Sequence, residues 1–162
     1  LSIDCISVSR ISHPSERLAV GDRLYAVVKS IDEDSGRFFL SQKELLGTWE
    51  ENAALFTAGQ TVAGIIRSVE SYGIFVELMP NLAGLAELRP DARDIEIGDT
   101  AAVFIKSIIP ERMKVKLILI DTHQNIGELA PTRYFIDCEN TPHIDRWRYS
   151  PECSGRIIET VF

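Results

Sequence analysis

The sequence has no long apolar run and no cluster of basic residues. No stretch of its 162 residues approaches the roughly 18 consecutive apolar residues that span a bilayer, and the opening LSIDCISVSR lacks the basic start and apolar core of a secretory signal. We therefore expect a cytoplasmic protein with no membrane partner. With 17 basic and 24 acidic residues, the net charge is -7, which argues against a general binder of polyanions. Any nucleic-acid site must be local.

Cysteine is scarce and shows no paired spacing. Cys5, Cys138 and Cys153 make an odd number without a Cys-x-x-Cys motif, which favours free buried thiols over a disulfide framework. A zinc site built from Cys138, His143 and Cys153 would have irregular spacing and no evident fourth ligand. Free thiols are the preferred interpretation, and no metal is expected.

The motifs of common catalytic and cofactor sites are also absent. The chain contains no Walker loop, Gly-x-Gly-x-x-Gly, His-Glu-x-x-His or Gly-x-Ser-x-Gly sequence. Carboxylates are interspersed with Arg89 and Arg93, a mixture typical of a solvated loop. We therefore expect no enzyme, no cofactor and no small-molecule substrate.

What the sequence does contain is a repeat. Gly-Asp and Lys-Ser-Ile recur at the same offset in 21–31 and 98–108. Each copy continues through a charged turn into an apolar segment, RFFLS at 37–41 and KVKLILI at 114–120. Both copies therefore predict a strand, a turn and a second strand.

The second copy has three further predicted strands upstream, at 61–70, 74–79 and 84–88. Together with the repeat they make about five short strands without intervening helical pattern, which indicates a small antiparallel barrel. The first copy has too few residues before its Gly-Asp for the same strands. We therefore expect the chain to begin inside a domain, with its first barrel truncated.

A short helix is predicted between the two copies, because Thr48 and Glu51 fit a capping box ahead of helically spaced apolar residues. Trp49 is interpreted as the packing anchor of this helix. In the tail, TRYFID and GRIIETVF look strand-like. The predicted fold is mainly β, with these parts: a partial barrel at 1–43, a linker helix within 44–58, a complete barrel at 59–121 and a small C-terminal β extension at 122–162.

Side-chain parity predicts that one aromatic residue of the complete barrel points outward. In IFVELM, Ile74, Val76 and Leu78 share one face, while Phe75 and Glu77 share the other. If the aliphatic side chains fill the barrel, Phe75 is offered to a partner beside Tyr72 of the preceding turn. The alternative is that Phe75 packs against the linker helix or the tail.

Barrels of this kind bind oligonucleotides on the second and third strands and the adjoining loops. Bases stack on aromatic rings while nearby cations hold the backbone. The predicted RNA-binding residues are Tyr72, Phe75, Arg67, Glu87, Arg112, Lys114 and Lys116.

The complete copy contains a series of short motifs: Gly59-x-x-Val-x-Gly-x-Ile, Tyr72-Gly-x-Phe-Val-Glu-Leu, Gly84-Leu, Ile97-Gly-Asp and Lys114-x-x-Leu. In this order they resemble the S-one RNA-binding domain, named after a large protein of the bacterial small ribosomal subunit. The resemblance implies tandem OB-fold barrels and the C-terminal part of a bacterial multi-domain S-one protein. It covers the complete barrel and, as the latter part of another domain, roughly 1–42.

The resemblance also implies which residues contact RNA. Its two stacking aromatics correspond to Tyr72 and Phe75, and its basic position to Lys114. The usual His is replaced by Glu87, the Ser after it by Arg89 and the usual Asp by Ile109. The losses of the His and the Asp leave half a site, so that binding would be weak or depend on linked domains.

Secondary candidates lie outside the complete barrel. The first copy keeps Asp32 and Arg37 at the positions of the usual Asp and the basic residue. In the tail, Arg146, Trp147 and Arg148 are a further candidate set, although strand parity favours a buried Trp147 between two outward arginines.

The function predicted from the sequence is binding of single-stranded RNA in translation or RNA metabolism, with the ribosome or a ribosomal protein as a further partner. The alternative is a non-catalytic docking module that binds a protein partner, which Glu87 and the acidic balance favour.

Overall fold

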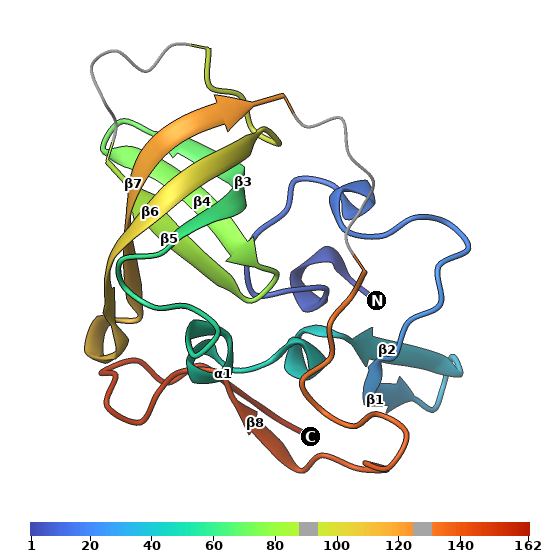
Figure 1. Cartoon of the computed structure of the whole chain (residues 1–162). Helices are drawn as coiled ribbons and strands as arrows, with labels where there is room; N and C mark the ends of the chain where they lie inside the picture. Colours follow the sequence, from blue (N-terminus) through green and yellow to red (C-terminus); the bar gives the residue numbers. More distant parts are fainter. Residues whose placement is uncertain (88–93, 125–130) are drawn as a thin grey trace.

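The computed structural model describes residues 1–87, 94–124 and 131–162, and five of its strands close into a barrel (Figure 1). The order around the barrel is β3-β4-β5-β7-β6, and β6 pairs back onto β3. All pairs are antiparallel except β5 with β7, so the predicted five-stranded barrel is confirmed with one parallel contact. The strands are β3 (Thr61–Glu70), β4 (Gly73–Met79), β5 (Leu82–Ala86), β6 (Thr100–Ile109) and β7 (Lys114–His123).

The barrel interior follows the predicted alternation. Ile74 and Val76 are fully buried on β4, and Leu78 packs against the edge of the same core. Phe75 is only half-buried on the opposite face. Burial of aliphatic side chains at this density is the main source of barrel stability.

The β3–β4 turn requires glycine at Gly73. A Cβ atom built there would lie 2.6 Å from the carbonyl oxygen of Ala86 on β5, closer than side-chain carbons approach a backbone oxygen. Gly73 thus lets β4 and β5 approach each other directly after Tyr72. This close approach fixes the position of Tyr72 in the turn at the end of the barrel.

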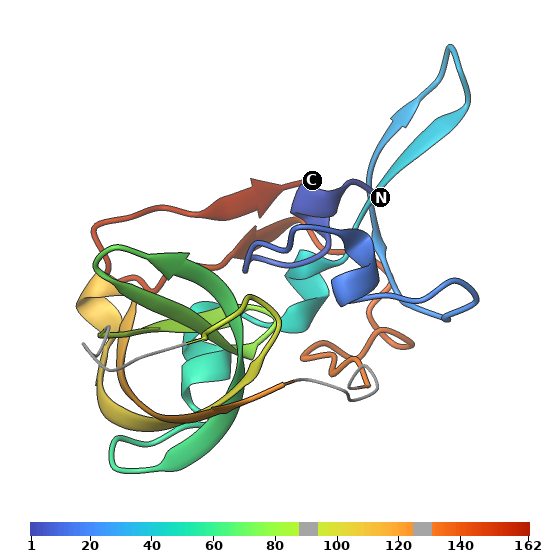
Figure 2. The ribbon, with the colours of Figure 1, turned by 90° about the horizontal axis from the view of Figure 1, so that it is seen from above.

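The first copy forms a separate hairpin, β1 (Val27–Asp32) and β2 (Arg37–Ser41), which projects from the rest of the molecule (Figure 2). The predicted strand, turn and strand are confirmed in both copies. Val28 pairs with Leu40 and Ser30 with Phe39, leaving a bulge at Lys29.

The β6–β7 hairpin has the same irregularity at the matching place. Ile105 pairs with Leu117 and Ser107 with Lys116, so that Lys106 is the bulged residue. Lys106 is the counterpart of Lys29 in the repeat. The repeated sequence therefore specifies one hairpin geometry twice, including its bulge.

Between the two copies lie η3 (Lys43–Leu46) and α1 (Trp49–Ala53). The predicted capping box is confirmed: Thr48 Oγ1 accepts from the Glu51 N–H, and the Thr48 N–H donates to the Glu51 carboxylate, both at 3.1 Å. Trp49 is buried, as predicted for a packing anchor. The helix is shorter than the predicted linker interval, 44–58.

The N-terminal segment contains two short turns, η1 (Ile3–Cys5) and η2 (Pro14–Glu16), and η4 (Pro110–Arg112) joins β6 to β7. In the tail, β8 (Arg146–Arg148) pairs with β9 (Glu159–Val161) as the expected small β extension. The segment 132–137 is not a strand, contrary to prediction; its Phe135 N–H instead donates to the Leu45 carbonyl at 2.9 Å. Among the described residues, no helix has the length and apolar character to cross a membrane.

Candidate nucleic-acid interface

Two aromatic rings lie together at the surface beside the β3–β4 turn. Tyr72 is 63% exposed and Phe75 is half-buried. Their ring centroids are 6.2 Å apart and the rings are nearly perpendicular, at 86°. This edge-to-face pair presents one ring in the turn and one on the outer face of β4, a geometry that can receive a flat ligand.

A row of paired residues connects Phe75 to a lysine across the sheet. Phe75 pairs with Leu85 on β5, and Leu85 pairs with Lys116 on β7. Paired residues on adjacent strands point to the same face and lie about 5 Å apart at their Cβ atoms. The exposed ammonium group of Lys116 therefore shares the outer face with the half-buried Phe75 ring.

The other predicted basic residues of this hairpin lie farther along it. Lys114 is two residues before Lys116 on β7, hence on the same face, and it is exposed. Arg112 is exposed in η4, one turn farther from the aromatic pair. The barrel thus brings Lys116 into the row of Phe75 and places Lys114 and Arg112 progressively farther away.

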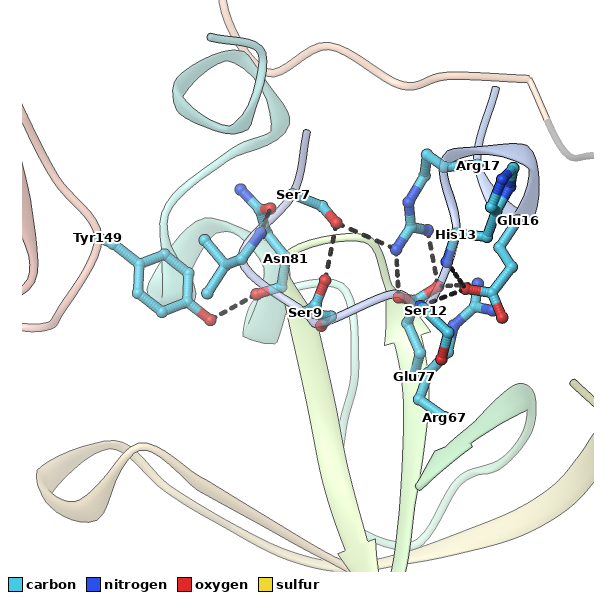
Figure 3. A network of polar contacts seen from close by, with 11 residues as sticks. Ser7, Ser9, Ser12, His13, Glu16, Arg17, Arg67, Glu77, Asn81 and Tyr149 are labelled. Atoms are coloured by element: carbon cyan, nitrogen blue, oxygen red, sulfur yellow. Dashed lines mark hydrogen bonds and ion pairs between the residues drawn. The ribbon is translucent and has the colours of Figure 1, made fainter. Parts of the chain in front are cut away.

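The outward carboxylate on β4 is covered by an arginine from the N-terminal segment (Figure 3). Arg17 donates to both oxygens of Glu77, at 2.8 and 2.5 Å. Arg67 donates to the same carboxylate at 3.1 Å. Two guanidinium groups outweigh the charge of Glu77, so this part of the outer face carries no net negative charge.

This network changes the role of Arg67. Its side chain is only 8% exposed because the Glu77 carboxylate holds it and the N-terminal segment covers both groups. Arg67 was one of the predicted RNA-binding residues, and the structure places its side chain in this enclosed ion pair. Arg67 supports the face electrostatically instead of extending from it.

The position that the resemblance assigns to histidine is occupied by an exposed carboxylate. Glu87 follows β5 directly and lies one residue beyond Ala86, the partner of Ile74. Ile109, at the position of the usual Asp, ends β6 half-buried. Arg89 and Arg93 lie outside the described residues.

The tail candidates are mostly engaged within the fold. Trp147 is 7% exposed, and its ring lies 5.8 Å from that of the buried Tyr149. The favoured interpretation of two core aromatics is confirmed, and Trp147 as a stacking platform is corrected because its ring is inside. Arg146 donates through Nε to Glu159 at 2.8 Å, and Arg148 donates to the Ser150 carbonyl at 3.1 Å.

The candidates of the first copy, Asp32 and Arg37, flank the turn of the projecting β1–β2 hairpin (Figure 2). Asp32 pairs with Arg37 across the turn. The Asp32 carboxylate accepts from the Ser35 hydroxyl at 2.6 Å and from the Asp34 N–H at 3.1 Å. These hydrogen bonds, led by that of Ser35, lower the pKa of Asp32. Its role here is to hold the turn.

Asn81 was not anticipated from the sequence, although it connects four parts of the molecule (Figure 3). Its Nδ2 donates to the carbonyls of Lys43 and Gly47, each at 2.8 Å, and its Oδ1 accepts from the Val8 N–H at 2.9 Å. Its carbonyl accepts from the Tyr149 hydroxyl at 2.5 Å, and burial raises the pKa of that phenol. A single Asn in a Pro-Asn turn gives no signal of such distant partners.

The thiols follow the free-cysteine prediction only in part. All three are free, but Cys5 is buried while Cys153 is exposed. Over residues 1–87, 94–124 and 131–162, no group of three or more His, Cys, Asp or Glu side chains is placed to hold a metal ion.

Comparison with known proteins gives one consistent relationship. No family model matches the chain. The small ribosomal subunit protein bS1 homolog of Bacillus cereus is 37% identical over 158 residues, covering 97% of this chain and 40% of that protein. The small ribosomal subunit protein bS1 of Chlamydia muridarum is 33% identical over 119 residues, covering 68% of this chain and 21% of that protein.

The chain thus spans between about a fifth and two fifths of the length of these relatives. Among solved structures, an uncharacterized protein of Methanocaldococcus jannaschii matches with 23% identity and a TM-score of 0.37, over 40% of this chain and 93% of that one. A TM-score of this size carries no structural argument. The curated relatives and the closed barrel together confirm the predicted resemblance: the chain is a relative of the bS1 proteins, after which the S-one domain is named.

Proposed function

We propose that this chain binds single-stranded RNA on the outer face of β4, β5 and β7, in translation or RNA metabolism, without a catalytic step. The observation that carries the proposal is the exposed Tyr72–Phe75 pair in one cross-strand row with Lys116. One base stacks on the aromatic pair, and the lysine neutralises a neighbouring phosphate. The names of the curated relatives, small ribosomal subunit proteins, support ribosome-associated RNA and a cytoplasmic location.

The charge of the face supports RNA over a protein partner at this site. Glu77 is balanced by Arg17 and Arg67, while Lys114 and Lys116 remain exposed. The exposed carboxylate of Glu87 is a negative charge that opposes RNA binding at this face. We expect modest affinity with a shallow salt dependence, since only a few cations lie near the aromatic pair.

The test is fluorescence anisotropy with a short mixed-sequence single-stranded RNA. Each lost stacking contact removes about 1–3 kcal/mol, so Tyr72→Ala combined with Phe75→Ala is expected to raise Kd by at least about tenfold. Lys116→Gln is expected to lower affinity less and to reduce the salt slope by about one charge.

Ile120→Ala is the matched control, because this apolar side chain is 50% exposed on the same barrel, four residues beyond Lys116 on β7. It should leave Kd unchanged. If the double aromatic variant also binds RNA with unaltered affinity, the proposed site is refuted and a docking role for the barrel gains support.

A further inference from the structure

An exposed carboxylate lies beside the aromatic pair on the outer face of the barrel. Ala86 is fully buried on the inner face of β5, while Leu85 is half-buried on the outer face. Glu87 follows Ala86 directly, is exposed and continues this alternation, so its side chain points outward. The face that carries the aromatic pair therefore also carries one negative charge.

The strand register puts this carboxylate within reach of a base stacked on Phe75. Phe75 pairs with Leu85 and Ile74 pairs with Ala86, so Glu87 is a diagonal neighbour of Phe75 on the outer face. Diagonal neighbours across an antiparallel pair lie about 7–8 Å apart, a separation that aromatic rings and long side chains bridge. A base on the Phe75 ring extends beyond the ring, so that its edge can meet the Glu87 carboxylate.

The position opposite Glu87 carries no side chain. By the same register it is Gly73, one residue before Ile74. A Cβ atom built at Gly73 would lie 2.9 Å from Cδ1 of Leu85, so the Leu85 side chain lies over this glycine. Leu85 thus forms an apolar surface that is bordered by the aromatic pair and by the Glu87 carboxylate.

The two outward carboxylates of this face differ in their surroundings. Glu77 on β4 is 5% exposed and is held by Arg17 and Arg67. Glu87, in contrast, forms no ion pair with any residue in 1–87, 94–124 or 131–162. Its two oxygens are exposed and can accept hydrogen bonds from a ligand.

A carboxylate at this position distinguishes among the RNA bases by their hydrogen-bond donors. An ionised carboxylate accepts hydrogen bonds and donates none. Guanine is the RNA base with two adjacent donors on its Watson–Crick edge, N1–H and N2–H, which match the two carboxylate oxygens. Adenine, cytosine and uracil each place an acceptor beside the donor on this edge, so that a lone pair faces the carboxylate. Unpaired bases in single-stranded RNA expose this edge to a protein.

We propose that Glu87 makes the site selective for guanine. The inference rests on the proposed function, since it requires a base stacked on the Tyr72–Phe75 pair. The carboxylate accepts from N1–H and N2–H of that guanine, while Lys116, across the sheet, holds a phosphate. Hydrogen bonds to an ionised group are about twice as strong as neutral ones, which offsets the repulsion between Glu87 and the RNA backbone.

The test is fluorescence anisotropy with short oligouridine RNAs that carry one central guanine, inosine or adenine. Guanine and adenine are both purines with large stacking surfaces, so their comparison isolates the edge contact. Inosine lacks the 2-amino group of guanine and hence one of the two donors. The guanine RNA is expected to bind at least about fivefold more tightly than the adenine RNA, with the inosine RNA between them.

Glu87→Gln removes the charge and replaces one acceptor oxygen by an amide donor. It should reduce the preference for guanine over adenine to less than about twofold and slightly tighten the binding of the adenine RNA. Glu111→Gln is the matched control, because it removes the same charge from an exposed position in η4. It should leave the preference for guanine unchanged.

Three outcomes would overturn the inference while the aromatic site stands. They are equal affinity of the parent chain for the guanine and adenine RNAs, a preference that survives Glu87→Gln, and an equal gain in affinity for every RNA in that variant. The third outcome would show that the carboxylate only repels phosphate. The proposed function fails separately if the Tyr72→Ala, Phe75→Ala double variant binds the guanine RNA as tightly as the parent chain.

Discussion

The two hairpins of this chain have the same geometry but different surroundings. β1–β2 and β6–β7 share a strand register, a bulged lysine and a left-handed residue in the turn, at Gly36 and Met113. One hairpin forms part of a closed barrel, while the other projects with its apolar side chains exposed. The comparison shows that a hairpin's own sequence determines its register, bulge and turn. The burial of its apolar side chains depends on the strands that cover it.

The largest contrast is expected from truncating matching apolar residues. Ile105→Ala should lower the free energy of unfolding by about 3 kcal/mol, because it leaves a cavity in the closed barrel. Val28→Ala, its counterpart, should change that free energy by less than about 0.5 kcal/mol, since Val28 is 47% exposed whereas Ile105 is fully buried. Urea denaturation followed by tryptophan fluorescence measures both. Equal losses of unfolding free energy would show that the two hairpins are equally well packed.

The turns give a smaller contrast. Gly36 has a φ of 68°, so Gly36→Ala places a Cβ in the left-handed region at a cost of about 1 kcal/mol. We expect faster amide exchange in β1 and β2. Gly155→Ala is the matched control, because that glycine has open space around it and no left-handed φ; its exchange pattern should match that of the parent chain. Met113 already carries a Cβ in the left-handed conformation, which the buried hairpin tolerates.

The smallest contrast is a pH effect confined to β1–β2. The pKa of Asp32 is lowered in the folded chain from a model-peptide value of 3.8. A lowered pKa stabilises the turn above pH 3.8, and this stabilisation is lost as the pH falls through the folded value. The protection factors of amides near Asp34 should therefore fall more in acid than those of the β6–β7 turn, where Ile109 holds the same place. Asp32→Asn should remove the difference; a difference that survives this change would exclude the carboxylate as its cause.

Local signals were the ones that the sequence revealed reliably. The strand at 61–70, the capping box at Thr48 and the outward parity of Phe75 all depend on residues a few positions apart, and all are confirmed. The repeat located both hairpins for the same reason. Each of these features is set by backbone period or by hydrogen bonds within one turn.

Contacts between segments distant in the sequence were not predicted. Arg17 reaches Glu77 across sixty positions, so parity placed Glu77 outward without showing that it would be covered. The segment 132–137 matches a strand pattern, but the Phe135 N–H donates to the Leu45 carbonyl and the segment forms no strand. Local propensity is overridden wherever such tertiary contacts form.

Asn81 has a practical consequence for dissecting the molecule. A fragment starting at Gly59 would lose the Val8, Lys43 and Gly47 partners of its amide and the Trp49 side chain buried against the barrel core. Three hydrogen bonds of an otherwise buried group would then pass to solvent. The sheet of the barrel is closed, yet the barrel is not an independent folding unit. The residues that satisfy Asn81 come from segments before and after the barrel in the sequence.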